Sequence, residues 1–112
     1  MAGQPSHYEI GVPDVERARA FYGALFGWEF DSSDHGAQVE TEPVPGGIHP
    51  ESVSGMQIFF SVPDIEGAAK RIVELGGEVD AGSSQGPGGR YLHSCRDDQG
   101  VPFGLHEPAN TR

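Results

Sequence analysis

The residues best suited to chemistry in this sequence are a histidine and a glutamate near its start, His7 and Glu9. They lie in a β-prone stretch, residues 7–12, in which side chains alternate between two faces, so both should point the same way. An imidazole beside a carboxylate can transfer protons without a metal. Glu9 can also serve as a metal ligand, as a general base or as a polar group that binds substrate. We rank a hydrogen-bonded carboxylate inside a cleft above a catalytic role for Glu9.

Further polar and aromatic residues can share the face of His7. Gln57 follows His7 by fifty residues, and alternation places Phe59 on the same face as Gln57, as an apolar wall. Two more histidines occupy short β-prone stretches, His49 in the first half of the chain and His106 in the second. We therefore expect one ligand site that is lined by His7, Glu9, Gln57, Phe59, His49 and His106.

The elements that must position these residues come from an internal duplication. The stretch Val-Pro-Asp-Val-Glu at residues 12–16 returns as Val-Pro-Asp-Ile-Glu at residues 62–66, with a constant offset and no gap. Two copies favour half-domains that close on each other, because an open solenoid needs three or more repeats. The ligand site is expected in a cleft that the two halves share.

Each half has the pattern of a βαβββ module. In both, a strand is followed by an aspartate that can cap a helix, by apolar residues at helical spacing and by a glycine. The helical stripe of the second half is Ile65, Ala68, Ala69, Ile72 and Leu75. The remaining strands are predicted at residues 28–30, 38–41, 46–49, 78–81, 90–95 and 102–106. Residues 82–89 contain four glycines and a proline, and are predicted to form a mobile loop or an edge turn.

The predicted fold class is therefore α+β, with two tandem βαβββ modules that form a curved mixed sheet around a shared cleft. Module 1 covers about residues 6–50 and module 2 about residues 56–108, within a single domain of residues 1–112. The join at residues 50–55 is short and polar. It permits closure within one chain or exchange between two chains, and we expect a homodimer.

Charge and composition limit the partners. The chain has 7 Lys and Arg against 17 Asp and Glu, a formal net charge of −10, so nucleic acid and anionic membranes would be repelled. A neutral or cationic small-molecule ligand is compatible with this charge. No apolar run is long enough to span a membrane, and no secretory signal is recognisable, so we expect a cytoplasmic protein. The lone Cys95 is expected to be a small strand residue.

Several segments resemble the vicinal oxygen chelate superfamily, which includes glyoxalase I, extradiol dioxygenases and bleomycin-resistance proteins. They are residues 7–10 (HYEI), 15–22 (VERARAFY), 26–28 (FGW) and 97–105 (DDQGVPFGL), and they are closest to small glyoxalase-like members. The resemblance covers nearly the whole chain and implies the paired βαβββ fold. It does not choose a reaction, because this scaffold carries both enzymes and non-catalytic binders.

The resemblance also implies a divalent metal, with ligands from the first and last strands of each module. His7 stands at the first-strand position, and Gln57 stands at its equivalent in module 2. Where the family carries last-strand carboxylates, this sequence has Gly47 and Gly104. We therefore favour no metal, since an imidazole and an amide are too few ligands. The alternative is a displaced site for Zn, Ni, Mn or Fe, with His7, Gln57, His49 and His106 as candidates.

The function that we favour from the sequence is small-molecule binding by a glyoxalase or bleomycin-resistance type of protein with a degraded metal site. Such a protein could sequester its ligand or confer resistance to it. The alternative is a divalent-metal-dependent lyase, isomerase or dioxygenase, in which Glu9 is the candidate catalytic residue. Glu107 lies on the opposite face from Gly104 and is expected to be a solvated strand end.

Overall fold

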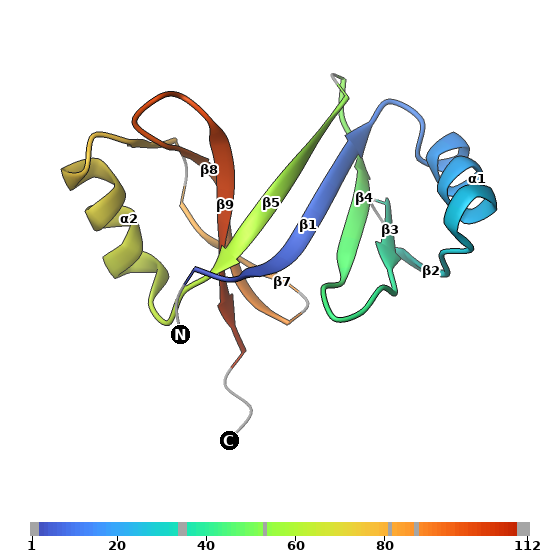
Figure 1. Cartoon of the computed structure of the whole chain (residues 1–112), viewed down its shortest axis with the longest axis horizontal. Helices are drawn as coiled ribbons and strands as arrows, with labels where there is room; N and C mark the ends of the chain where they lie inside the picture. Colours follow the sequence, from blue (N-terminus) through green and yellow to red (C-terminus); the bar gives the residue numbers. More distant parts are fainter. Residues whose placement is uncertain (1–2, 34–35, 53, 81, 87, 110–112) are drawn as a thin grey trace. The chain divides into compact units, whose positions relative to one another are not determined.

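The computed structural model describes residues 3–33, 36–52, 54–80, 82–86 and 88–109, and the chain divides into two compact units (Figure 1). The N-terminal unit consists of residues 7–57. The C-terminal unit consists of the residues before 7 and after 57. Among the helices of the described segments, none has the length and apolar character that crossing a membrane requires.

The N-terminal unit is a four-stranded mixed sheet with one helix. Its elements are β1 (Pro5–Val12), α1 (Val15–Phe26), β2 (Phe30–Ser33), β3 (Gly36–Val39) and β4 (Gly46–Pro50). The strand order is β2-β3-β4-β1, in which β4 and β1 run parallel and the other neighbours run antiparallel. This arrangement confirms the first predicted βαβββ module.

The C-terminal unit repeats that topology. Its elements are β5 (Gly55–Ser61), α2 (Ile65–Glu74), β6 (Glu78–Val79), β7 (Ser84–Gly86), β8 (Gly89–Arg96) and β9 (Pro102–Pro108). The first residues of β5, up to Gln57, belong to the N-terminal unit. The order β6-β8-β9-β5 matches that of the first unit, and β5 pairs with β9 in parallel as β1 does with β4. The α+β fold class with two βαβββ modules is therefore confirmed. The shared cleft and the single domain stay predictions.

The expectation of a loop or edge turn over residues 82–89 is wrong in part. The short strand β7 pairs with β8 in an antiparallel hairpin, in which Ser84 lies opposite Tyr91. Backbone hydrogen bonds to a neighbouring strand can hold a glycine-rich segment extended, and local composition does not reveal that partner.

The helix boundaries follow local chemistry. The Asp14 side chain accepts the backbone N–H of Arg17 at 3.1 Å, which satisfies one of the open donors at the start of α1. Gly27 ends α1 in the left-handed region at φ 73°, a conformation that residues with a side chain rarely adopt. Both features agree with the sequence-based expectation.

Each unit buries its own apolar cluster against its helix. The first is centred on Ile10, Ala18, Val39 and Ile48, and the second on Ile65, Leu92, Cys95 and Leu105. Leu75, predicted to belong to the buried stripe of α2, is instead 60% exposed. The helix ends at Glu74, so Leu75 no longer follows the helical turn that would place it on the buried face.

A β-bulge changes the faces of β8. Leu92 lies opposite Leu105 and Cys95 lies opposite Phe103, so two residues of β8 stand against one of β9. Simple alternation placed Cys95 on the face of Tyr91. The extra residue instead brings Cys95 into the apolar cluster with Leu92.

Burial makes Cys95 an unreactive thiol. The side chain is 1% exposed, and desolvation, together with the charge of Asp80, raises the pKa of Cys95 to about 11. The thiolate is the reactive form, so the folded protein should not react with a disulfide reagent such as DTNB at pH 8, whereas protein unfolded in urea should react fully. The absorbance of the coloured thiolate released from DTNB, followed over time, measures the reaction rate of the folded and of the unfolded protein. Fast stoichiometric labelling of folded protein would contradict this packing.

Candidate functional site

A carboxylate held between two imidazoles lies in the N-terminal unit. Glu9 Oε2 is 2.5 Å from His7 Nε2, and Glu9 Oε1 is 2.8 Å from His49 Nδ1. We call these three residues the His7–Glu9–His49 group. The structure therefore brings together three of the six predicted site residues.

Strand alternation and pairing explain this arrangement. Tyr8, Ile10 and Val12 of β1 pack into the apolar cluster with α1, so His7 and Glu9 point to the other face of the sheet. Parallel pairing with β4 places Glu9 opposite Gly47 and so brings His49 within reach of the carboxylate.

Gly47 leaves room for the Glu9 carboxylate. A Cβ atom at position 47 would stand 3.1 Å from both carboxylate oxygens of Glu9. The resemblance implies a metal-binding carboxylate at position 47, but Gly47 has no side chain. The Glu9 carboxylate, from the neighbouring strand β1, occupies the adjacent space.

The electrostatics of the group favour an ionised Glu9. The carboxyl is partly buried, which by itself would raise its pKa. The hydrogen bonds and charges of His7 and then of His49 outweigh that effect and lower the pKa of Glu9 below its ordinary value. Only 18% of the Glu9 side chain is exposed. The group therefore presents a partly desolvated carboxylate that contacts two imidazoles.

Glu51 extends the group and was not anticipated from the sequence. Its Oε2 lies 3.2 Å from His49 Nε2, so His49 contacts one carboxylate through each ring nitrogen. The available signal was its position two residues after His49, on the same side of an extended segment.

His106 belongs to a different cluster, in the C-terminal unit. Its ring stacks on Tyr91 with 4.6 Å between ring centroids, its Nδ1 lies 2.9 Å from Ser6 Oγ, and its Nε2 lies 3.0 Å from the Gly88 carbonyl oxygen. Both ring nitrogens therefore contact protein groups. The sequence leaves open which face of its strand Tyr91 occupies, and the structure buries Tyr91 against His106 and Phe59.

Phe59 and Gln57 occupy different parts of β5. Phe59 is fully buried in the C-terminal unit, where its ring lies edge-on to Tyr91 and His93. Gln57 is half-buried and belongs to the N-terminal unit. A Cβ at Gly104 would overlap the Phe59 ring, so an aromatic ring fills the space at the second expected carboxylate position.

The donor set does not match the metal site that the resemblance implies. Ring nitrogens of His7 and His49 contact opposite oxygens of one carboxylate, and the two family carboxylate positions are glycines. Within the described segments, one group of three acidic, histidine or cysteine side chains has ligand atoms that all lie within 4.8 Å of one another. The group consists of Asp64, Glu66 and Glu107.

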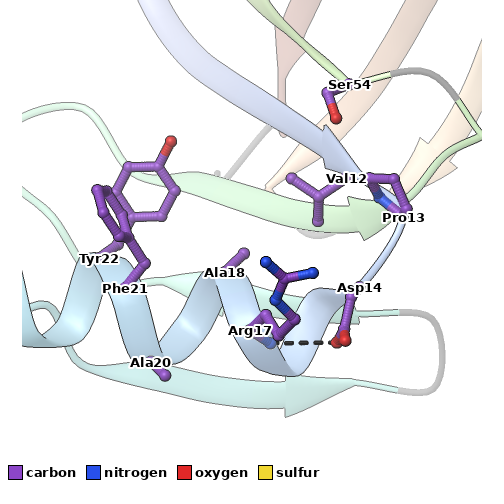
Figure 2. A pocket seen from close by; sticks show the side chains of 9 residues that line it. All are labelled: Val12, Pro13, Asp14, Arg17, Ala18, Ala20, Phe21, Tyr22 and Ser54. Atoms are coloured by element: carbon purple, nitrogen blue, oxygen red, sulfur yellow. Dashed lines mark hydrogen bonds between the residues drawn. The ribbon is translucent and has the colours of Figure 1, made fainter.

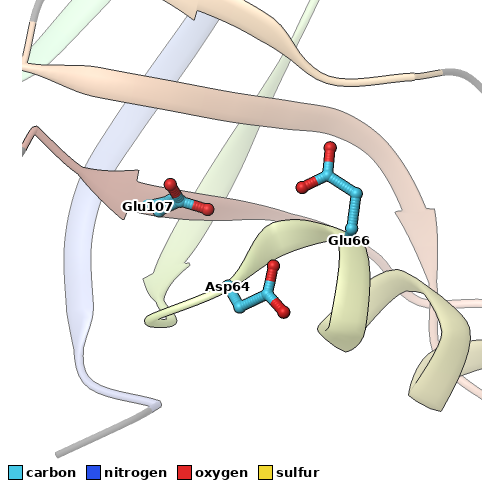
Figure 3. Close-up of side chains that lie close together, drawn as sticks. All are labelled: Asp64, Glu66 and Glu107. Carbon is cyan, nitrogen blue, oxygen red and sulfur yellow. The ribbon is translucent and has the colours of Figure 1, made fainter.

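The Asp64, Glu66 and Glu107 carboxylates lie at the start of α2 and on β9 (Figure 3). Glu107 Oε1 accepts the backbone N–H of Ile65 at 2.9 Å, and both carboxylate oxygens of Glu66 accept hydrogen bonds from Arg90, which hold the pKa of Glu66 below its ordinary value. We assign this cluster to stabilisation of the helix start.

The expectation that Glu107 is a solvated strand end is therefore wrong. Its side chain is half-buried and provides the N-terminal cap that Asp64 does not supply through a side-chain hydrogen bond. The contact joins residues 42 positions apart, so the local sequence could not reveal it.

Comparison with known proteins agrees with the resemblance. The model of the Glyoxalase/Bleomycin resistance protein/Dioxygenase superfamily matches residues 4–105. A glyoxylase-like domain-containing protein of Didymella fabae is 31% identical over 92 residues, which cover 70% of this chain and 72% of the relative. An ethylmalonyl-CoA/methylmalonyl-CoA epimerase of Cereibacter sphaeroides is 32% identical over 101 residues, with 70% and 75% covered. 

Similarity extends to solved structures. A methylmalonyl-CoA epimerase, solved in complex with methylmalonyl-CoA and NH4+, superposes with a TM-score of 0.69 at 18% identity, and the match covers 100% of this chain and 99% of that chain. At this identity the likeness establishes a common fold and leaves the activity open.

Proposed function

Because the chain belongs to the glyoxalase/bleomycin resistance protein/dioxygenase superfamily, we propose that it binds a small molecule through the His7–Glu9–His49 group without a divalent metal. The observation that carries this proposal is the position of the Glu9 carboxylate between two imidazoles. One ring nitrogen of each histidine, His7 Nε2 and His49 Nδ1, contacts this carboxylate, so neither nitrogen is available to a metal in this arrangement.

The charge of the group indicates the class of ligand. Glu9 is an ionised acceptor in a partly desolvated site, and the chain carries a net charge of −10. An ammonium, amide or hydroxyl group can donate to this carboxylate, whereas an anionic group would be repelled. We therefore propose a neutral or cationic ligand, held by sequestration rather than converted.

A divalent-metal-dependent enzyme is the second candidate. The similarity to the epimerase of Cereibacter sphaeroides favours it, since that relative is named for a reaction. Imidazole and carboxylate are also ordinary ligands of zinc and iron. On this alternative, metal binding would have to pull His7 and His49 away from their present contacts with Glu9.

Metal analysis separates the two candidates. Protein purified without chelator or affinity tag is expected to carry no stoichiometric metal, and calorimetric titration with Ni²⁺, Zn²⁺, Mn²⁺ and Fe²⁺ should show no saturable site that depends on His7. The His7→Ala variant should therefore titrate like the unmodified protein. His93→Ala is the matched control, because His93 is an exposed histidine outside the group.

The opposite result would be one metal ion per chain that is lost in His7→Ala and kept in His93→Ala. The loaded protein should then be assayed for epimerisation of methylmalonyl-CoA and for glyoxalase and dioxygenase reactions, and the metal-free proposal would be abandoned.

A further inference from the structure

A groove lies in the N-terminal unit, along the first turns of α1 (Figure 2). It has a volume of about 560 Å³, which is within the range of small-molecule sites. Its lining includes Val12, Asp14, Arg17, Ala18, Phe21 and Tyr22.

This groove is distinct from the His7–Glu9–His49 group. Val12 lines the groove and packs in the cluster on the α1 side of β1, whereas Glu9 points to the opposite face of the sheet. The two sites share no residue, so a ligand can bind in the groove whether or not the His7–Glu9–His49 group is occupied.

The wall of the groove is mostly apolar and aromatic. Phe21 exposes 62% of its apolar side chain to water. The Tyr22 ring lies edge-on to the Phe21 ring, with 5.2 Å between ring centroids. An aromatic or short acyl group lying along Phe21, Ala18 and Val12 would remove this apolar surface from water.

Arg17 provides a positive charge beside that apolar wall (Figure 2). In the described segments, each other arginine lies within 4.0 Å of a carboxylate, and these pairs are Arg19–Glu16, Arg71–Glu74, Arg90–Glu66 and Arg96–Asp80. No such pair involves Arg17 among those residues. A guanidinium at the edge of an apolar groove, with no carboxylate within 4.0 Å among the described residues, favours an anionic ligand group at that point.

The other polar groups set the orientation of a ligand. Asp14 would repel an anion at its end of the groove, and its Oδ1 already accepts the Arg17 N–H. Ser54 supplies a hydroxyl donor among the same lining residues. We propose that the groove binds a small aryl or acyl carboxylate, with its apolar body on Phe21 and its carboxylate on Arg17 and Ser54.

Titration with 3-phenylpropionate, followed by backbone amide chemical shifts, tests this assignment. The groove is open, so the expected dissociation constant is on the order of 1 mM, with shifts centred on residues 12–22 and Ser54. The nearly isosteric 3-phenylpropanamide, which lacks the negative charge, should bind about three- to fivefold more weakly.

Matched variants distinguish the two contacts. Arg17→Gln should weaken binding of 3-phenylpropionate by about three- to fivefold and leave binding of the amide unchanged. Arg19→Gln, in the same helix but paired with Glu16, should bind like the unmodified protein. Phe21→Ala should weaken both probes, whereas Phe26→Ala should not, although Phe26 is comparably exposed at 58%.

Equal binding of the acid and the amide, shifts centred outside these residues, or equal effects of Arg17→Gln and Arg19→Gln would each overturn the assignment. The metal titration of the His7–Glu9–His49 group does not involve this groove, so either proposal can fail without the other.

Discussion

Phe59→Ala is expected to lower the free energy of unfolding by about 3–5 kcal/mol. The ring is fully buried, contacts Tyr91 and His93 edge-on and fills the space above Gly104. Truncation would leave a cavity beside strands β5 and β9. Hydrogen bonds hold the backbones of these two strands together, so neighbouring residues should move only a little into the cavity. Urea unfolding followed by far-UV circular dichroism measures the loss.

Val73→Ala is the control for this substitution, because Val73 belongs to the same unit and is 60% exposed. It should change the free energy of unfolding by less than about 0.5 kcal/mol. A loss below about 1 kcal/mol for Phe59→Ala would contradict the packing of the ring.

A double-mutant cycle tests the contact with Gly104 directly. Gly104→Ala places a methyl group into the Phe59 ring and should destabilise the protein by about 1–3 kcal/mol. In the Phe59→Ala background the same change should have little effect, because the ring is gone. Additive effects of the two substitutions would mean that Gly104 is required for another reason.

Glu9→Gln is expected to lower the free energy of unfolding by roughly 1–3 kcal/mol at neutral pH. Glutamine keeps the shape of the side chain but removes the charge that His7 and His49 contact at 2.5 Å and 2.8 Å. Equilibrium unfolding at several pH values measures the effect. Glu16→Gln is the matched control, since Glu16 forms an exposed pair with Arg19 on α1.

The pH dependence of this effect has a definite sign. The pKa of Glu9 is lowered in the folded state from the ordinary 4.5, so unfolding at mildly acidic pH takes up a proton. The stabilisation by Glu9 is complete above pH 4.5 and decreases as the pH falls through the lower, folded pKa. The facing titratable groups are His7 and His49, with Glu51 against His49.

The difference in stability between the unmodified protein and Glu9→Gln should therefore shrink at acidic pH. A difference that stays constant down to the acid transition would show that the substitution acts through shape rather than through charge.

The paired modules could be predicted because their signals are local and occur twice. Asp14 precedes a helical pattern and caps it, and Gly27 follows that pattern and ends it in the left-handed region. The offset of fifty residues repeats the same residue types around α2, although there Glu107 and not Asp64 caps the helix through its side chain. The resemblance to the superfamily rests on the same segments, and the match over residues 4–105 confirms it.

Part of the candidate site could also be predicted. Alternation alone placed His7 and Glu9 on one face of a strand, and they are in contact. Their contact with His49 depends on the parallel register between β1 and β4, which places Glu9 opposite Gly47. That register is a pairing between distant segments, and no spacing within either strand specifies it.

The sequence by itself determined the order of both helices and of every strand but the short β7, the family and the residues with reactive side chains. The tertiary structure alone decided which of them meet. A one-residue bulge moved Cys95 to the other face of β8, Glu107 from a distant strand capped α2, and the Phe59 ring filled the space above Gly104. Each outcome depends on backbone register and side-chain packing between segments far apart in the chain, whereas sequence patterns report only on neighbours within a few residues.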